Sequence, residues 1–438
     1  MSSRSRACPS TTTPSRKRSS IPRAATGAAV VAFVALAFAP LGVDGATPPL
    51  CKCPASSGAC TAAQLVRSSD GTTACGAVDG NGKLDASVVL DSTAQATSLD
   101  LTGVKTLTGY LRLSATPVTT LKTDDLVTAG SINIATNDDL TVLSFPVLTG
   151  FAGTSDPDSV LQLEVLKTSA ALVNATFPKL ATASNVTCEA PGGVVCDLRS
   201  VTHLTGALRV RNANLAELKN VSGNAYFDEH DGATVAAEKL EHVGGDLTLM
   251  LSKDAKEVDL PRLAKVDGKV LVDEYSAGGA NTALTALSFP ALTDVGGSLR
   301  VESLDGLAVL RCEELRNIGG ALELRLLPAL KSAYFQRVEK VESVSIGGDF
   351  KDAEVHVPCV AGGLLGLTTA SGGNNVNAVP TDRVTWRWPD GCSHQPEAAP
   401  DPSLASTPTP PKSGARAAVA TGRFAILLPA LAWGVRLR

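Results

Sequence analysis

The chain has 438 residues, of which 44% are hydrophobic but only 4% aromatic, and its formal net charge is -4. Six Lys or Arg residues lie within residues 1–45 and four Arg residues within residues 414–438, so the segment between them is more acidic than the whole chain. Nucleic-acid binding depends on clustered cations, and this acidic centre therefore argues against it.

The first 45 residues predict a signal peptide. Basic residues occupy Met1–Arg23, an apolar run follows over residues 24–41, and small residues at Val43 and Gly45 favour cleavage before Ala46. An uncleaved signal-anchor helix and an Arg- and Ser-rich organellar transit peptide are the alternatives. Downstream cysteines and glycosylation sequons argue against the transit peptide.

Cysteines are concentrated just after this leader, where we expect a disulfide-bonded N-terminal cap over residues 46–84. Zinc binding is the alternative for the close pair at Cys51 and Cys53, but export and the absence of nearby His disfavour it. We also expect Cys188 to pair with Cys196, and Cys359 with Cys392. The disulfide candidates are therefore Cys51, Cys53, Cys60, Cys75, Cys188, Cys196, Cys359 and Cys392, and the odd ninth cysteine of the mature chain is Cys312.

Residues 79–85, with the sequence DGNGKLD, resemble the middle of a calcium loop. The flanking ligand positions are Ala77 and Val88, which supply no side-chain oxygen. A plain turn is the favoured interpretation.

A short motif, Gly-x-Φ-x-Φ with Φ being Leu, Val or Ile, recurs along residues 85–360. The alternation predicts strands with one buried face, and stacked copies would supply each other's partners. We expect the Gly to allow a positive φ and to avoid collisions where the chain bends into the sheet. The first apolar positions fall at residues 111, 132, 161, 186, 208, 225, 247, 270, 299, 322 and 344.

A second element, Phe/Leu-Pro-x-Leu, separates the strands and predicts a bend, since Pro fixes φ. It occurs at residues 145–148, 177–180, 260–263, 289–292 and 327–330. The two signals together predict a mainly β fold, a right-handed β-solenoid or leucine-rich-repeat-like stack with repeats of about 22 residues. Residues 361–394 are expected to cap its C-terminal end, with Trp386 and Trp388 in a packed terminal strand rather than a sugar platform.

Three sequons, at Asn174, Asn185 and Asn220, are glycosylation candidates if the chain is exported. A Pro/Ser/Thr-rich stalk over residues 395–412 precedes residues 413–438, which have the order of a glycosylphosphatidylinositol (GPI) anchor signal. The candidate attachment residues are Ser413, Gly414 and Ala415. A transmembrane helix is the alternative, but the apolar run over residues 424–435 spans only about 18 Å of a core of about 30 Å.

No familiar catalytic motif, cofactor motif or metal motif occurs in the sequence, and the five His are scattered. Residues 228–231, with the sequence DEHD, place carboxylates beside an imidazole, and a solvated loop is the favoured interpretation. We therefore expect a non-enzymatic protein without a cofactor. A polysaccharide-active β-helix enzyme is a weaker alternative, because paired carboxylates and stacking aromatics are not evident.

The unit FPALTDVGGSLRVESLDGLAVL, residues 289–310, resembles the repeats of receptor L-domains, and most closely those of fungal GPI-anchored cell-wall organisation proteins. The resemblance covers residues 85–360 together with the leader and anchor arrangement. It implies a GPI-anchored glycoprotein of the outer plasma membrane or the cell wall that supports envelope organisation. A receptor-like or adhesive module that binds an extracellular protein or glycan is the alternative.

Overall fold

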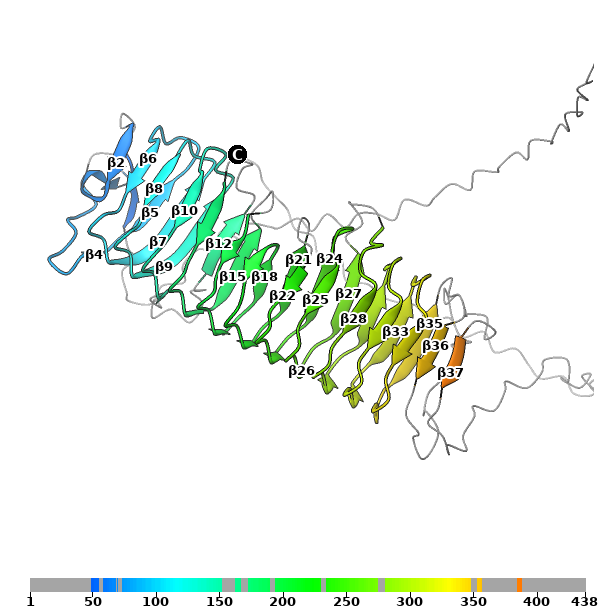
Figure 1. The fold of residues 1–438 in the computed structure, drawn as a ribbon. Coiled ribbons are helices and arrows are strands. Elements are labelled where there is room, and N and C mark those ends of the chain that lie inside the picture. The colour runs from blue at the N-terminus through cyan, green and yellow to red at the C-terminus, as the bar shows by residue number, and fades with distance from the viewer. Residues whose placement is uncertain are drawn as a thin grey trace, which may run out of the picture. The chain divides into compact units, whose positions relative to one another are not determined.

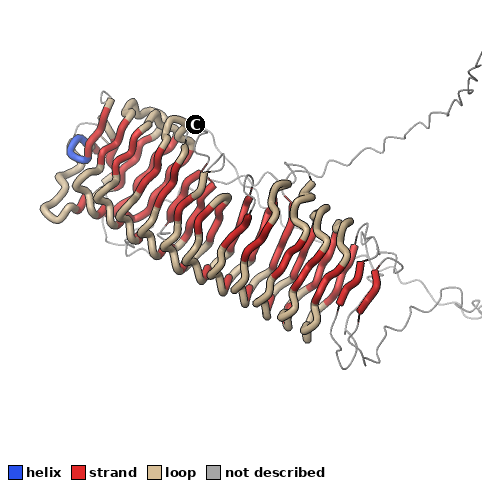
Figure 2. The backbone as a smooth tube through the Cα atoms, in the orientation of Figure 1, coloured by secondary structure: helices blue, strands red, loops and turns tan. Residues whose placement is uncertain are grey.

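The structure is a computed structural model that describes residues 49–54, 58–67, 69, 73–151, 162–166, 172–189, 194–229, 234–274, 280–347, 353–356 and 384–387. All of these lie in one compact unit, Thr47–Arg438. They form a β-solenoid in which successive coils lie side by side in chain order, as Figures 1 and 2 show. Secondary structure is almost entirely strand, with one short 3₁₀ helix, η1 (Ala62–Gln64), in the described part.

The largest sheet, here called the main sheet, contains one strand from each coil. Every pair within it is parallel except the first, where β3 runs antiparallel to β1. The path is β3 (Val66–Arg67), β1 (Leu50–Lys52), β5 (Ser87–Leu90), β7 (Thr106–Ser114), β9 (Thr128–Ala135), β12 (Gln162–Leu166), β15 (Asn185–Glu189), β18 (Leu208–Val210), β21 (Ala225–Glu229), β24 (Leu247–Leu251), β27 (Val270–Glu274), β30 (Leu299–Glu302), β33 (Ala321–Arg325) and β35 (Ser343–Gly347), with β4 (Lys83–Leu84) beside β7 and β11 (Gly150–Phe151) beside β9.

A second face of the coil follows each main-sheet strand and is divided into four parallel sheets. These contain β2 (Ala59–Thr61), β6 (Ser98–Asp100) and β8 (Thr120–Lys122); β10 (Val142–Ser144), β13 (Asn174–Thr176), β16 (Cys196–Asp197) and β19 (Ala213–Asn214); β22 (Thr234–Ala236) and β25 (Glu257–Asp259); and β28 (Ala286–Ser288), β31 (Val309–Arg311), β34 (Ser332–Tyr334), β36 (Ala353–His356) and β37 (Val384–Arg387).

The third face is a ladder of two-residue strands. It contains β14 (Thr182–Ala183), β17 (His203–Leu204), β20 (Asn220–Val221), β23 (His242–Val243), β26 (Lys265–Val266), β29 (Asp294–Val295) and β32 (Asn317–Ile318). From β14 to β34 the chain thus visits the main sheet, the second face and the third face in turn, which explains why each predicted repeat contains more than one strand.

The register of the main sheet confirms the predicted β-solenoid and its spacing of about 22 residues. Leu111 pairs with Ile132, and the same column continues through Val186, Leu208 and later predicted positions to Val344. One position was wrong: the residue paired with Ile132 is Leu163, not Leu161, which lies outside the described residues. A period-two pattern looks the same after a shift of two residues, so neighbouring coils decide the register.

The core is a single cluster of buried apolar side chains between the three faces. In β24, Leu247, Leu249 and Leu251 are fully buried while Thr248 and Met250 face outward, the alternation expected of a strand covered on one side. Each fully buried Leu contributes about 1.5–3 kcal/mol of hydrophobic stabilisation. Because each coil covers its neighbours, this stabilisation depends on stacking.

The Phe-Pro-x-Leu element is a β-turn between the second and third faces. The Leu148 and Leu180 amides donate to the carbonyl oxygens of Phe145 and Phe177, with Pro in the second position of the turn. The two Phe rings stack at 5.3 Å between centroids and are fully buried. The Leu-Pro element at residues 327–330 is different, since it forms the turn between the main sheet and the second face.

The repeat glycines are required by close packing rather than by backbone conformation. Positive φ among the described glycines occurs at Gly76, Gly82 and Gly103, none of which begins a repeat, so that part of the expectation was wrong. A Cβ at Gly245 would lie 2.8 Å from the carbonyl carbon of Gly223 in the preceding coil. The predicted collision is therefore the reason for the glycine.

A ladder of polar side chains runs beside these glycines. In each case a side-chain oxygen accepts the backbone N–H of the corresponding residue one coil later, which joins adjacent coils. Written with the residue that donates its backbone N–H first and the residue whose side chain accepts second, the pairs are Tyr110 and Ser87, Ala207 and Asn185, Asp246 and Asn224, Lys269 and Asp246, and Ala321 and Ser298.

Candidate functional site: the outward face of the main sheet

Charged and aromatic side chains occupy many outward positions of the main sheet between β15 and β33, and are here called the polar face. Strand β24 interrupts the set, because its outward residues are Thr248 and Met250. Alternation along each strand sends every second residue outward, and the parallel register aligns these residues in two columns. The polar face consists of Glu189, Arg209, Arg211, Tyr226, Asp228, Asp273, Arg300, Glu302, Glu323 and Arg325.

At one end of the polar face, Arg209 links its two neighbouring strands. Its guanidinium forms an ion pair with Glu189 of β15 and lies over the ring of Tyr226 of β21, 4.7 Å from the ring centroid. The central carbon of the guanidinium is thereby held over the Tyr226 ring, within the range of a cation–π contact. Arg209 remains 38% exposed, so part of its hydrogen-bonding fork faces solvent.

At the other end, four charged residues form a network across β30 and β33. Arg300 Nη2 lies 2.5 Å from Glu302 Oε2, and Arg325 Nη2 lies 2.9 Å from Glu323 Oε2. A longer cross-strand pair, 3.8 Å between Arg300 Nε and Glu323 Oε2, joins the two. Both carboxylates are largely covered, at 12% and 19% side-chain exposure, whereas both arginine side chains are about two-fifths exposed. Arg300 Nε is itself buried.

Asp273 of β27 lies beside this network. Its neighbour in the next coil is Glu302, because Val272 pairs with Val301. Burial raises the pKa of the Asp273 carboxyl and the charge of Glu302 adds to the rise, whereas the Glu274 amide, which donates to Asp273 Oδ1 at 2.7 Å, opposes it. Two carboxylates on adjacent strands of one face are therefore held at an electrostatic cost.

The expectation of a solvated loop at residues 228–231 was wrong for its first two residues, which the structure places in a strand. Asp228 and Glu229 belong to strand β21, and Asp228 is only 4% exposed. His230 and Asp231 lie outside the described residues. The backbone pairing of β21 with β24 continues through both acids, Asp228 with Met250 and Glu229 with Leu251. The sequence alone does not reveal this, because Asp is uncommon in strands.

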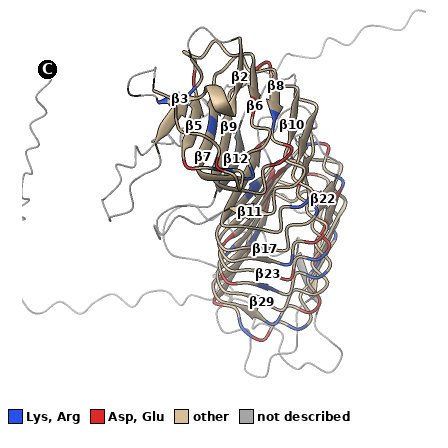
Figure 3. Ribbon diagram, turned by 90° about the vertical axis from the view of Figure 1, so that its left-hand side faces the viewer, with Lys and Arg blue, Asp and Glu red and all other residues tan. Residues whose placement is uncertain are grey.

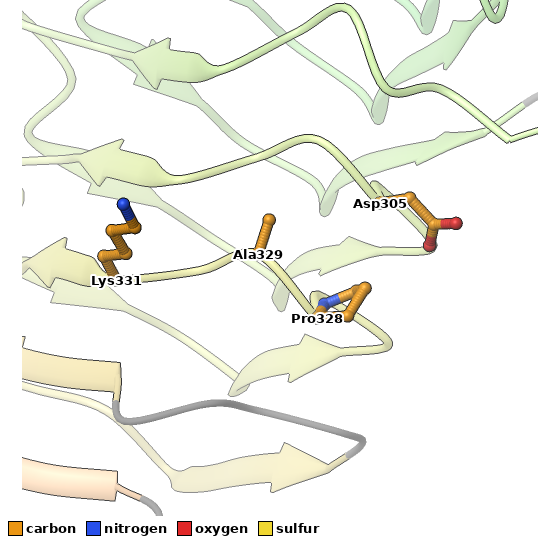
Figure 4. Close-up of a pocket in the computed structure, with 4 residues that line it drawn as sticks. All are labelled: Asp305, Pro328, Ala329 and Lys331. Carbon is orange, nitrogen blue, oxygen red and sulfur yellow. The ribbon is translucent and has the colours of Figure 1, made fainter. Parts of the chain in front are cut away.

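A separate hollow lies where the main sheet turns into the second face (Figure 4). It is an open cavity of about 340 Å³ lined by Asp305, Pro328, Ala329 and Lys331. The four residues come from the equivalent turns of two successive coils, Leu304–Leu307 and Leu327–Leu330, and from the residue after the second turn. The hollow is therefore a product of coil stacking.

The third face carries charge of both signs, as Figure 3 shows along the coils with β17, β23 and β29. Lys265 Nζ lies 2.7 Å from Asp267 Oδ1, and His242 Nε2 lies 2.9 Å from Asp267 Oδ2. The hydrogen bonds from Lys265 and then His242 lower the pKa of the Asp267 carboxyl. Exposed pairs of this kind contribute little to stability, because solvent screens them.

The structure joins three pairs of cysteines as disulfides. Cys51 pairs with Cys75 and Cys53 with Cys60 at the N-terminal end of the stack, with Cα–Cα distances of 5.9 and 5.8 Å. Cys188 of β15 pairs with Cys196 of β16, the predicted local loop, at 6.5 Å. Cys312 is free and fully buried. Cys359 and Cys392 lie outside the described residues, as do the anchor candidates Ser413, Gly414 and Ala415.

The expected N-terminal cap continues the stack rather than covering it as a separate layer. Within residues 46–84, β1 pairs with β5 in the main sheet and β2 pairs with β6 on the second face. The antiparallel strand β3 then occupies the sheet edge. At the other end, β37 pairs in parallel with β36, and the backbone of Trp386 is in register with the buried Val355.

Asp79 accounts for the calcium-like sequence at residues 79–85. Its Oδ1 accepts the amides of Asn81 and Lys83, both at 2.8 Å, and these backbone hydrogen bonds contribute to lowering the pKa of the carboxyl, that of Lys83 most strongly. The carboxylate thus stabilises its own turn. Within the described residues, no group of three or more His, Cys, Asp or Glu side chains is arranged to hold a metal ion.

The three sequons lie on three different faces: Asn174 in β13 of the second face, Asn185 in β15 of the main sheet and Asn220 in β20 of the third face. Asn174 is exposed, whereas the other two are partly buried. Asn185 Oδ1 accepts the Ala207 amide at 2.6 Å, so this side chain belongs to the polar ladder.

The fold defines a repeat protein of the β-solenoid class. Comparison with known protein families, with curated proteins and with solved structures finds no match to this chain. In the part of the chain that the structure describes, no helix has the length and apolar character needed to cross a membrane.

Proposed function

We propose that this chain is a non-enzymatic scaffold protein exported to the cell surface, where it supports the organisation of the cell envelope. The observation that carries the proposal is the disulfide-closed N-terminal end of the stack, with Cys51–Cys75 and Cys53–Cys60 in the first coils. Disulfides persist in oxidising compartments and are rare in the cytosol. Their presence supports export.

A regular stack suits a structural role. Each coil contacts its neighbours through parallel strands, buried apolar columns and the polar ladder, so the whole array resists local distortion. The signal peptide expected at residues 1–45 and the GPI signal expected at residues 413–438 would place this array outside the cell. The resemblance to fungal GPI-anchored cell-wall organisation proteins agrees with this role.

Surface release tests the proposal directly. A tag inserted within residues 395–412 should be accessible to antibody on intact cells, and phosphatidylinositol-specific phospholipase C should release the tagged protein where a mock treatment does not. An inaccessible tag would contradict export. An accessible tag that is retained would contradict a cleavable lipid anchor and favour a wall linkage, a resistant anchor or a membrane-spanning end.

Loss of the gene tests the role itself. Cells without this protein should show lower envelope integrity and lower resistance to wall stress than cells that carry the full-length chain. Unchanged envelope integrity and stress resistance, in cells shown to display the wild-type protein, would contradict the structural role.

A second candidate function is favoured by the polar face: a binding module for an extracellular protein or glycan. The Arg300 side chain is 40% exposed and lies against the largely covered carboxylate of Glu302, so its solvent-facing N–H groups can donate hydrogen bonds to a polar ligand. In a screen of surface glycans and proteins, a saturable partner should bind wild type and weaken with Arg300→Ala but not with Lys265→Ala on the third face. Equal effects of the two variants, or the absence of any saturable partner, would contradict this candidate.

A further inference from the structure

The sequon residue Asn174 lies within a patch of exposed apolar side chains on the second face. Val142 is 44% exposed, Val173 is 73% exposed and Val195 is 50% exposed. These three valines come from three successive coils, and they are among the few large hydrophobic residues that the described part of the chain leaves exposed.

The strand register centres the patch on Asn174. Val142 of β10 is the direct Cα partner of Asn174, and Val195 is the corresponding residue of the next coil because Ala175 pairs with Cys196. Val173 precedes Asn174, and its amide donates to the carbonyl oxygen of Thr141. With coils about 4.8 Å apart, all three valines lie within about 10 Å of the Asn174 backbone.

The valines are not the exposed edge of a poorly packed core. Their inward neighbours Leu143, Ala175 and Cys196 are fully buried, so the core behind the patch is complete. Each Val side chain nevertheless leaves much of its apolar surface in solvent, and exposed apolar surface of this kind is normally covered or kept small.

We propose that Asn174 carries an N-linked glycan and that this glycan covers the valine patch. In the transfer, Asn174 Nδ2 bonds to the anomeric carbon of an oligosaccharide while that carbon's bond to a lipid pyrophosphate breaks, and the displaced amide proton leaves with the pyrophosphate. The glycan is bulky and solubilising, and it is tethered at the centre of the surface that needs cover. This proposal rests on the export proposed above.

The other two sequons do not share this setting. Asn185 is held in the polar ladder, and Gly206 of the next coil packs so closely on its carboxamide that a Cβ there would lie 3.1 Å from Asn185 Cγ. Asn220 lies between His203 and His242 in its column, with no exposed valine in register. Among the large apolar residues that the described part of the chain leaves exposed, those in register with a sequon surround Asn174.

Expression of the full chain behind a secretion leader of known activity tests the proposal independently of the native leader. Peptide mass mapping of the secreted protein should find Asn174 glycosylated. Asn174→Gln should increase the binding of a hydrophobic dye several-fold, because the patch is uncovered, whereas Asn220→Gln should leave dye binding unchanged. When Asn174→Gln is combined with V142T, V173T and V195T, dye binding should return to the wild-type value. An unmodified Asn174, or equal dye binding by the Asn174→Gln and Asn220→Gln variants, would overturn the proposal.

A second measurement tests the proposal even if the Asn174→Gln variant does not fold or is not secreted. Enzymatic removal of the glycan from the folded wild-type protein should raise dye binding, whereas the same treatment of the folded V142T/V173T/V195T protein should not. An equal response of both proteins would overturn the proposal. Failure of the native chain to reach the cell surface would instead contradict the proposed function and leave this glycan result standing.

Discussion

Asn281 Nδ2 donates a hydrogen bond to the main-chain oxygen of Ser252 at 2.5 Å, and thereby joins one coil to the coil before it. The same nitrogen lies 3.1 Å from the oxygen of Ala255, and Asn281 Oδ1 accepts the amides of Ala283 and Leu284. Asn281 is fully buried, so its carboxamide replaces water for four backbone groups. Asn137, also fully buried, similarly satisfies three backbone groups and the Thr116 hydroxyl.

Replacing Asn281 with Ala should destabilise the stack strongly. Buried carbonyl and amide groups would lose their partners, at about 1–3 kcal/mol for each group left unsatisfied. Chemical denaturation followed by circular dichroism would measure the loss. The control is Asn224→Ala, because Asn224 is exposed and accepts one amide, from Asp246. Similar denaturation midpoints for the two variants would contradict the assigned role.

Gly245→Ala should be poorly tolerated, whereas Gly80→Ala should be nearly neutral. A Cβ at Gly245 would collide with the backbone of the preceding coil, while a Cβ at Gly80 would meet nothing within 4 Å. We expect Gly245→Ala to lower the free energy of unfolding by about 1–3 kcal/mol, as for an overpacked site. Thermal melting of both variants measures the contrast, and a stable Gly245→Ala protein would show that adjacent coils can separate.

Cys312 should react with thiol reagents only when the stack opens. It follows Arg311 in β31, and its place between the coils of Phe289 and Phe335 leaves it fully buried. Burial raises the pKa of the Cys312 thiol to about 12, so the reactive thiolate is nearly absent at neutral pH. Alkylation followed by mass spectrometry should be slow in buffer and fast in denaturant; rapid labelling of native protein would contradict the described packing.

Asp273→Asn should stabilise the protein at neutral pH and have a smaller effect in acid. Because the folded-state pKa of Asp273 is raised, the folded state binds the proton more tightly than the unfolded state does, and its contribution to stability is lost as the pH rises through that pKa. Denaturation at pH 7 and below about pH 4 would measure the difference. Asp305→Asn in the open hollow is the control, and a pH-independent effect at Asp273 would contradict the electrostatic cause.

Local pattern was sufficient to predict the class of fold. Alternating apolar residues after glycine, as at residues 245–249, define strands with one buried face, and their regular spacing implies stacking. The Phe-Pro-x-Leu turns and the Cys188–Cys196 pairing were also recognisable from sequence, since both depend on residues that are close in the chain. Local sequence could not distinguish Leu161 from Leu163, because both satisfy the same alternation.

The sequence by itself thus determined that the chain folds as a stack of β coils with a cysteine-rich beginning. The tertiary structure decided which distant residues meet: Asn281 with Ser252, Arg300 with Glu323, and Asn174 with the exposed valines of neighbouring coils. The physical reason is that these contacts join residues about 20 to 30 positions apart. Their formation depends on the register and length of every intervening coil, which no local pattern specifies.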